Sequence, residues 1–211
     1  MTQDSLARRE RRALCDTALA VGEDAPTLCG DWDAKELVAH LLVRERSPLA
    51  ALGIAVPPLA GATDRAMARQ ARRDFTVLVE RVRRPGPIPG VAPVVEPLFN
   101  TLEFFVHHED LRRAQPGWEP RELSTADLDT LWRGLRLTGR GLVRNAGVPL
   151  QARRTDTGDT ITLRPGDDPV VVSGPPAEVV LRLHGRRQVR DVEAEGPADG
   201  MARLREASLG F

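Results

Sequence analysis

The sequence LEFFVHHEDLRR, residues 102–113, is apolar in its first half, charged in its second half and free of glycine and proline. This pattern predicts a helix. On such a helix Glu103 and His107 are four residues apart, so their side chains lie one above the other on the same face. Asp110 follows three residues later, close to that face. A carboxylate and an imidazole at this spacing can bind one divalent metal ion, although the same pair also occurs as a plain hydrogen bond on a helix surface or in a core.

A second informative helix begins after Trp32. Asp33 and Glu36 have the spacing of a capping box, with Asp33 as the N-cap. His40 falls within the apolar face of this helix. A buried imidazole needs a polar partner. If His40 is an ordinary core histidine, that partner is a backbone carbonyl or a buried carboxylate; if it is a ligand, the partner is a metal ion. The apolar face itself consists of Leu37, Val38, Leu41 and Leu42.

The remaining helical signals suggest a bundle. We expect helices over Ser5–Val21, about Asp64–Arg83 and from Ser124 to before Gly147. Two connections rich in proline, Ser47–Thr63 and Arg84–Pro97, separate them. The first helix also carries four arginines, Arg8, Arg9, Arg11 and Arg12, which form either an anion-binding patch or, as the balanced charge favours, a solvated face.

In a helical bundle, sites are built from side chains that project inward from facing helices. His40, Glu103 and His107 would then form a set of two histidines and one carboxylate. Three protein ligands leave one position open, as in catalytic sites, and this donor set suits Zn²⁺, with Ni²⁺, Fe²⁺ and Mn²⁺ as alternatives. Asp110 is expected either to accept a hydrogen bond from His107 and so orient its ring without binding the metal itself, or to form a salt bridge with Arg112 or Arg113. His108 points about 100° away from His107 and is interpreted as a supporting or structural group.

After Val148 the hydrophobic period changes to that of strands. Leu150–Arg154, Thr160–Arg164 and Pro169–Ser173 alternate and are separated by turn residues, which predicts a small antiparallel meander. A helix from Gly174 to about His184, a strand at Val189–Ala194 and a helix at Pro197–Ala207 follow. The fold class is therefore α+β, with a helical domain over residues 1–147 and a small α+β domain over residues 148–211.

Composition narrows the function classes. The chain has 30 basic and 30 acidic residues, and a net charge of zero argues against general nucleic-acid binding. No apolar run is long enough for a membrane span, and the polar residues 1–12 do not predict a signal peptide, so we expect a cytoplasmic protein. Cys15 and Cys29 are isolated and outside any CxxC pattern, which predicts two reduced thiols without a redox or zinc-thiolate role.

Three stretches resemble a known family. Residues 29–40 (CGDWDAKELVAH) resemble the signature of DinB-like metal-binding bundles, and residues 103–111 (EFFVHHEDL) resemble a stretch of the mycothiol-dependent maleylpyruvate isomerase branch. Residues 174–178 and 183–186 resemble the small C-terminal domain of that branch, which is similar to sterol-carrier-protein folds. The resemblance implies a DinB-like four-helix bundle followed by a fifth helix, with zinc bound by His40, Glu103 and His107 and mycothiol as cofactor or co-substrate.

The resemblance also implies that an arginine of the small domain contacts substrate. Arg186 is the candidate, with Arg187 and Arg190 close by in sequence, and the alternative is that Arg186 is a solvated surface arginine. The resulting hypothesis is a metal-dependent enzyme that activates a small thiol, a mycothiol S-transferase or isomerase acting on an electrophile. Its rival is a non-catalytic metal-binding sensor or ligand-binding module, in which His108 or Asp110 closes the open position. A bundle without metal and with His40 as a core histidine is a third interpretation. No oligomeric state is predicted.

Overall fold

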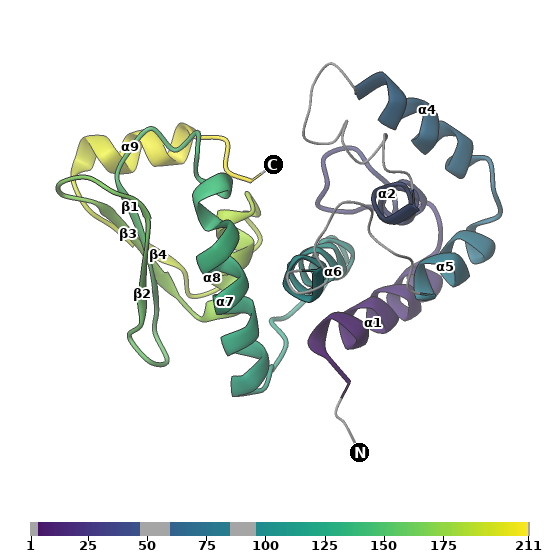
Figure 1. Cartoon of the computed structure of the whole chain (residues 1–211), viewed down its shortest axis with the longest axis horizontal. Coiled ribbons are helices and arrows are strands. Elements are labelled where there is room, and N and C mark those ends of the chain that lie inside the picture. Colours follow the sequence, from purple (N-terminus) through teal and green to yellow (C-terminus); the bar gives the residue numbers. More distant parts are fainter. Residues whose placement is uncertain (1–3, 47–59, 85–95, 211) are drawn as a thin grey trace. The chain divides into compact units, whose positions relative to one another are not determined.

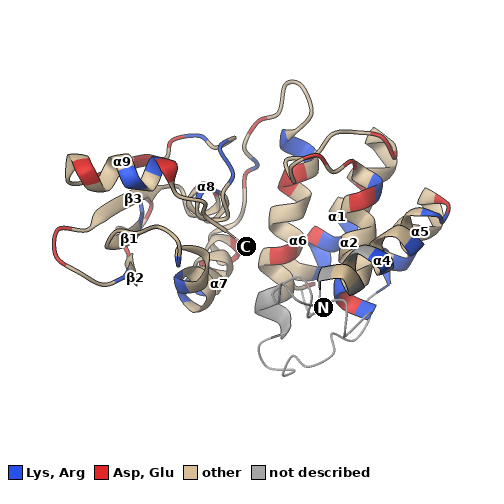
Figure 2. Ribbon diagram, turned by 90° about the horizontal axis from the view of Figure 1, so that it is seen from above, with Lys and Arg blue, Asp and Glu red and all other residues tan. Residues whose placement is uncertain are grey.

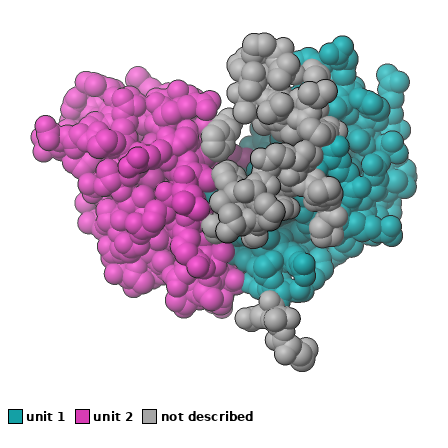
Figure 3. Space-filling model, in the orientation of Figure 1, with its two compact units in different colours: residues 1–119 teal, residues 120–211 magenta. Residues whose placement is uncertain are grey.

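The computed structural model describes residues 4–46, 60–84 and 96–210 of the chain. Contacts divide the chain into two compact units, residues 1–119 and 120–211 (Figure 3). The first unit is helical and the second combines helices with a sheet (Figure 1). The predicted α+β class, with a helical bundle followed by a small α+β part, is confirmed.

The first unit is a bundle of four helices, α1 (Leu6–Val21), α2 (Ala34–Arg46), α5 (Phe75–Arg83) and α6 (Glu96–Arg113). These helices share one apolar core, to which each contributes fully buried side chains such as Leu14, Leu41, Leu78 and Phe104. A further helix, α4 (Ala60–Ala71), packs beside α2. The core therefore holds α2 and α6 next to each other, and these are the helices that carry the candidate ligands.

The single helix expected over residues 64–83 is wrong, because α4 and α5 are separate helices. Asp74 separates the two helices. Its side chain accepts a hydrogen bond from the backbone N–H of Val77 at 3.1 Å and so forms the N-cap of α5. An aspartate at an N-cap competes with the helical backbone that would otherwise run through it. The proline-rich connections predicted at Ser47–Thr63 and Arg84–Pro97 lie largely outside the described residues.

Arg11 corrects the expectation of a solvated arginine face on α1. Its guanidinium is buried in the bundle, where Nη1 donates to Glu45 Oε2 at 2.9 Å and to the carbonyl of Val82 at 2.7 Å. Nη2 pairs with the other oxygen of Glu45, and the guanidinium lies 4.1 Å from the centre of the Phe104 ring. An arginine can be buried when a carboxylate pairs with it in a bidentate geometry. The charges along one helix do not reveal such a partner, because the partner lies on another helix.

The second unit begins with α7 (Thr125–Leu142) and contains β1 (Leu150–Arg154), β2 (Thr160–Arg164), β3 (Val170–Gly174), α8 (Pro176–Leu183), β4 (Glu193–Glu195) and α9 (Ala198–Glu206). The strand order is β2-β1-β3-β4, and helices α7 and α8 pack on the sheet and on each other (Figure 1). Elements after Val148 thus match the predicted β-β-β-α-β-α order.

The predicted antiparallel meander is wrong in one pairing. β1 pairs with β2 in the antiparallel sense, but β3 lies on the other side of β1 and runs parallel to it. β3 is almost continuously buried along its length, whereas β2 alternates between buried and exposed residues. A strand buried on both faces suits the middle of a sheet, and an alternating strand suits an edge.

Helix α7 belongs to the second unit in the structure, whereas the predicted boundary at residue 147 assigns it to the helical domain. The helix packs on α8 and β2 and buries Leu131, Trp132, Leu135 and Leu142. The indole N–H of Trp132 also donates to Asp159 at 2.8 Å. The boundary of the independently folding domain stays a prediction, and it can be tested with fragments.

We expect fragment 120–211 to unfold cooperatively in urea and fragment 148–211, which lacks α7, to be unfolded. Each large apolar side chain lost from a core removes about 1.5–3 kcal/mol, and four such losses rival the roughly 5–15 kcal/mol stability of a whole domain. Circular dichroism during urea titration measures both fragments. A cooperative transition of fragment 148–211 equal to that of fragment 120–211 would instead support the boundary at residue 147.

Residues of both charge signs are distributed over both units (Figure 2), in keeping with the equal numbers of acidic and basic residues. Among the helices of the described ranges, none combines the length and the apolar character that crossing a membrane requires.

Candidate metal centre

His40 on α2 and Glu103 and His107 on α6 meet at one place in the bundle. The capping box that starts α2 is confirmed: the backbone N–H of Glu36 donates to Asp33 Oδ1 at 2.8 Å, and that of Asp33 donates to Glu36 Oε2 at 3.2 Å. This start fixes the helical phase that turns His40 toward α6. On α6, the four-residue spacing stacks Glu103 and His107 as expected.

The three side chains converge on the carboxylate of Glu103. The Nε2 atom of His40 and the Nε2 atom of His107 each lie 3.4 Å from Glu103 Oε1. One potential ligand atom from each residue lies within 4.8 Å of the others, and the two imidazole rings are 5.3 Å apart between centroids. The predicted convergence of these residues is therefore present in the fold.

The spacing of these atoms fits a tetrahedral metal. Two ligand atoms that are each about 2.0–2.2 Å from a tetrahedral ion lie about 3.3–3.6 Å apart, and both measured imidazole-to-carboxylate separations are 3.4 Å. The side chains of His40, Glu103 and His107 are 10%, 24% and 12% exposed. The group is thus largely shielded from solvent but not completely buried.

The electrostatics favour a charged carboxylate at the centre. Burial alone would raise the pKa of Glu103, but the Arg44 charge and the neighbouring imidazoles of His107 and His40 hold that pKa well below its usual value. Burial lowers the pKa of His40, although the neighbouring carboxylate of Glu103 acts in the opposite direction. Near neutral pH, His40 is therefore neutral and Glu103 anionic, which are the states that bind a metal.

Asp110 lies on the far side of the His107 ring. Its Oδ2 atom is 3.0 Å from His107 Nδ1, and the carboxylate is fully buried. A carboxylate that accepts the Nδ1–H of an imidazole leaves Nε2 as the nitrogen that can bind a metal and fixes the ring orientation. The arginines that were the alternative partners of Asp110, Arg112 and Arg113, each form a salt bridge with Glu109.

Comparison with solved structures identifies the architecture. The crystal structure of a mycothiol-dependent maleylpyruvate isomerase matches with a TM-score of 0.63 and 19% sequence identity, and the match covers 90% of each chain. A histidine-to-alanine mutant of the mycothiol-dependent maleylpyruvate isomerase matches with a TM-score of 0.64 at the same identity and coverage. The chain has the fold of this isomerase. No protein-family model and no curated protein sequence matches the chain.

Within this isomerase fold, His108 joins neither the candidate ligands nor Asp110. Both of its ring nitrogens face α1, where Nδ1 lies 2.9 Å from Glu10 Oε2 and Nε2 lies 3.0 Å from Thr17 Oγ1. This contact links α6 to α1 and gives His108 a structural role. Arg186 lies in the second unit just after α8, where its guanidinium donates to the carbonyl of His184 at 2.5 Å. Its contact with a substrate stays a prediction.

Three residues of the centre were not assigned to it from the sequence. Arg44 Nε lies 3.2 Å from Glu103 Oε1, and the Trp32 ring lies 5.1 Å from the ring of His40. Cys29, which is half-buried, donates its thiol hydrogen to Asp110 Oδ2 at 2.9 Å. Arg44 could have been found, because it follows His40 by one helical turn. Cys29 and Trp32 lie in a loop, where the sequence has no periodic pattern that would indicate which way their side chains point.

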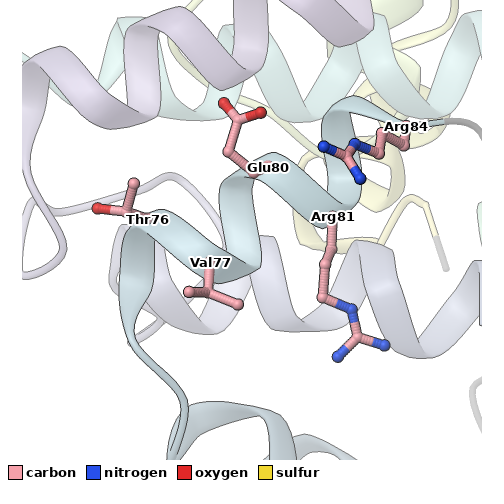
Figure 4. A pocket seen from close by; sticks show the side chains of 5 residues that line it. All are labelled: Thr76, Val77, Glu80, Arg81 and Arg84. Atoms are coloured by element: carbon pink, nitrogen blue, oxygen red, sulfur yellow. The ribbon is translucent and has the colours of Figure 1, made fainter.

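Cavities elsewhere on the isomerase fold do not involve these residues. One of about 280 Å³ lies on α5 and is lined by Thr76, Val77, Glu80, Arg81 and Arg84 (Figure 4). Another of about 320 Å³ lies in the second unit between the end of α8 and the C-terminal segment. Neither contains a candidate ligand.

Proposed function

We propose that this protein is a divalent-metal-dependent enzyme that binds the metal through His40, Glu103 and His107 and acts on a small thiol and an electrophilic substrate. Zinc is the metal that this donor set suits best, and mycothiol is the thiol to test first, since the solved isomerase of the same fold is mycothiol-dependent. A bound metal would supply Lewis-acid activation and lower the pKa of a coordinated thiol.

The observation that carries this proposal is the spacing of the three ligand atoms. Each imidazole Nε2 lies 3.4 Å from the same oxygen of Glu103, the separation that a tetrahedral ion imposes on neighbouring ligands. An ordinary hydrogen bond between an imidazole and a carboxylate is about 2.7–3.0 Å long. The two longer separations therefore support a preformed metal site over a hydrogen-bonded core cluster.

The other residues of the centre have roles that follow from their contacts. Asp110 fixes the tautomer and orientation of His107 through the Nδ1 contact. Arg44 places a positive charge beside Glu103, which favours an anionic molecule, such as a thiolate or carboxylate, at the open position. Trp32 packs against His40 and shields it from water on one side.

The rival function, a metal-binding module without catalysis, was expected to close the open position with His108 or Asp110. His108 faces α1, and Asp110 contacts Nδ1 of His107, the nitrogen opposite the one that faces Glu103. The positions of both residues support an open site and thereby the enzyme.

The proposal is tested by measuring metal content in the wild type and in His40→Ala, each followed by calorimetric titration with mycothiol. We expect about one equivalent of metal in the wild type, loss of it in the variant, and thiol binding that requires the metal. Val38→Ala, an apolar truncation on the same helix, is the matched control and should retain the metal. Metal without thiol binding would favour the binding module, and absence of metal from the wild type would overturn the proposal.

We also expect metal affinity to rise with pH. Burial tends to lower the pKa of His107, but its contacts with Asp110, Cys29 and Glu103 outweigh burial and raise that pKa well above the usual value. The metal must displace this proton, so below the raised pKa the affinity should increase about tenfold per pH unit and then level off above it. Competition with a chelating dye at several pH values measures the slope. An affinity that does not depend on pH would show that His107 is not a ligand.

A further inference from the structure

His107 is shared by two groups of potential ligands. Its Nε2 atom lies 3.4 Å from Glu103, in the group that includes His40, whereas its Nδ1 atom faces Cys29 and Asp110. In the second group, Cys29 Sγ lies 2.9 Å from Asp110 Oδ2 and 3.5 Å from His107 Nδ1, and the latter two atoms are 3.0 Å apart. One thiol, one carboxylate and one imidazole nitrogen therefore meet at one point.

The backbone holds Cys29 in this position. The N–H of Leu28 donates to the carbonyl of Asp110 at 3.1 Å, which attaches the loop before α2 directly to α6. The N–H of Cys29 donates to Thr27 Oγ1 at 3.1 Å, and that of Trp32 donates to the carbonyl of Cys29 at 3.2 Å. The loop turns at Gly30, whose φ of +62° is readily adopted by glycine. The thiol is thus fixed beside the carboxylate by the fold.

We infer that Cys29, Asp110 and Nδ1 of His107 form a second cation site, selective for thiophilic divalent ions such as Cd²⁺. Thiolate ligands select soft metals, whereas imidazole and carboxylate ligands alone accept borderline and harder ions. On binding, the S–H bond of Cys29 and the Nδ1–H bond of His107 break, a sulfur–metal and a nitrogen–metal bond form, and both protons leave to solvent. His107 takes part as the tautomer whose proton is on Nε2.

The charge of the group and the clustering of its ligand atoms within 4.8 Å of one another support this assignment. A thiolate and a carboxylate together neutralise a divalent ion, and Asp110 is fully buried, where an ion bound with an unbalanced charge would be costly. The Glu103 group has one anionic ligand and Arg44 beside it. A thiolate sulfur and an imidazole nitrogen on one tetrahedral zinc ion lie about 3.5–3.6 Å apart, and Cys29 Sγ and His107 Nδ1 are 3.5 Å apart. Asp110 Oδ2 lies at hydrogen-bond distance from both atoms, 2.9 Å and 3.0 Å, so a bound ion would push this oxygen away from them.

The two sites compete because they share one imidazole. A neutral imidazole has one acceptor nitrogen, so a metal at Nδ1 removes His107 from the Glu103 group, and a metal at Nε2 does the reverse. By thermodynamic linkage, a metal bound at one site lowers the affinity of the other site for its metal, and the factor is the same in both directions. The proposal of the second site stands without the proposed function, whereas competition between the two sites rests on the proposed metal site at Glu103.

Cadmium titration of the metal-free full-length chain under reducing conditions tests the site, with the ultraviolet absorption of the sulfur-to-cadmium bond as the readout. We expect this band in the wild type and its loss in Cys29→Ser, with Cd²⁺ affinity at least tenfold lower. The serine hydroxyl can still donate to Asp110, so the variant should fold. Cys15→Ala removes the other thiol, which is buried and outside the group, and should keep the band.

The site would be disproved by absence of the band from the wild type, by its persistence in Cys29→Ser or by its loss in a folded Cys15→Ala. His40→Ala separates this site from the proposed function, because it removes a ligand of the Glu103 group alone. A variant that loses zinc but keeps the cadmium band supports both sites. Retention of zinc by His40→Ala would overturn the Glu103 site and leave the cadmium result intact.

Discussion

Replacing Glu103 by glutamine should weaken metal binding about 10²–10³-fold. Zinc sites with four ligands bind with about 10–16 kcal/mol, or roughly 2.5–4 kcal/mol for each ligand, and each 1.4 kcal/mol corresponds to about tenfold in affinity. Glu103 is the anionic member of its group and contacts both imidazoles. The amide keeps the shape of the side chain but leaves the Arg44 charge, 3.2 Å from Oε1, unopposed beside the metal.

Competition between the protein and a chelator of known affinity measures this loss. Glu119→Gln is the matched control, since Glu119 is an exposed glutamate of the same unit, and its affinity should equal that of the wild type. Circular dichroism of Glu103→Gln should show an intact bundle. Equal affinity of Glu103→Gln and the wild type would exclude Glu103 as a ligand and favour the alternative of a hydrogen-bonded core cluster.

Replacing Arg11 by leucine should destabilise the bundle by about 3–5 kcal/mol, because removal of one partner leaves the other as an uncompensated buried charge. That partner is Glu45, whose side chain is completely buried. The substitution also removes the hydrogen bond to the carbonyl of Val82 and the contact with the Phe104 ring. Urea unfolding followed by circular dichroism gives the change in the free energy of unfolding.

Arg12→Leu is the control for this prediction. Arg12 is adjacent in sequence but exposed, and it pairs with Asp4 at the surface, so its loss should change stability by no more than about 0.5 kcal/mol. The double variant Arg11→Met/Glu45→Leu removes both charges and should regain much of the lost stability. A loss below about 1 kcal/mol in Arg11→Leu would mean that water or another group compensates Glu45.

The convergence of the candidate ligands was predictable because it depends on helix geometry. Glu103 and His107 share a face through their four-residue spacing, and His40 lies on the apolar face that α2 must bury. Two buried helical faces in one small bundle have few alternatives to meeting each other. The α+β class was predictable for a similar reason, since the period of the hydrophobic residues changes after Val148.

Other features depend on contacts between residues that are distant in sequence. The sequence around Arg11 predicts a surface residue. Its burial depends on the ion pair with Glu45, which is 34 positions away in the sequence. Cys29 reads as an isolated thiol until the loop before α2 is attached to the backbone of α6. The position of β3 beside β1 depends on which strand buries more surface, and alternation along a strand indicates its faces but not its neighbours.

The sequence by itself determined the helices that carry His40, Glu103 and His107, the capping box that begins α2 and the change from helices to strands. These features arise from local spacing and backbone preferences, which act over a few residues. Only the tertiary structure decided that Asp110 serves His107 and that Cys29 and Arg44 border the same centre. Such contacts form when packing of the apolar core brings distant polar groups together, and each buried group must then find a partner.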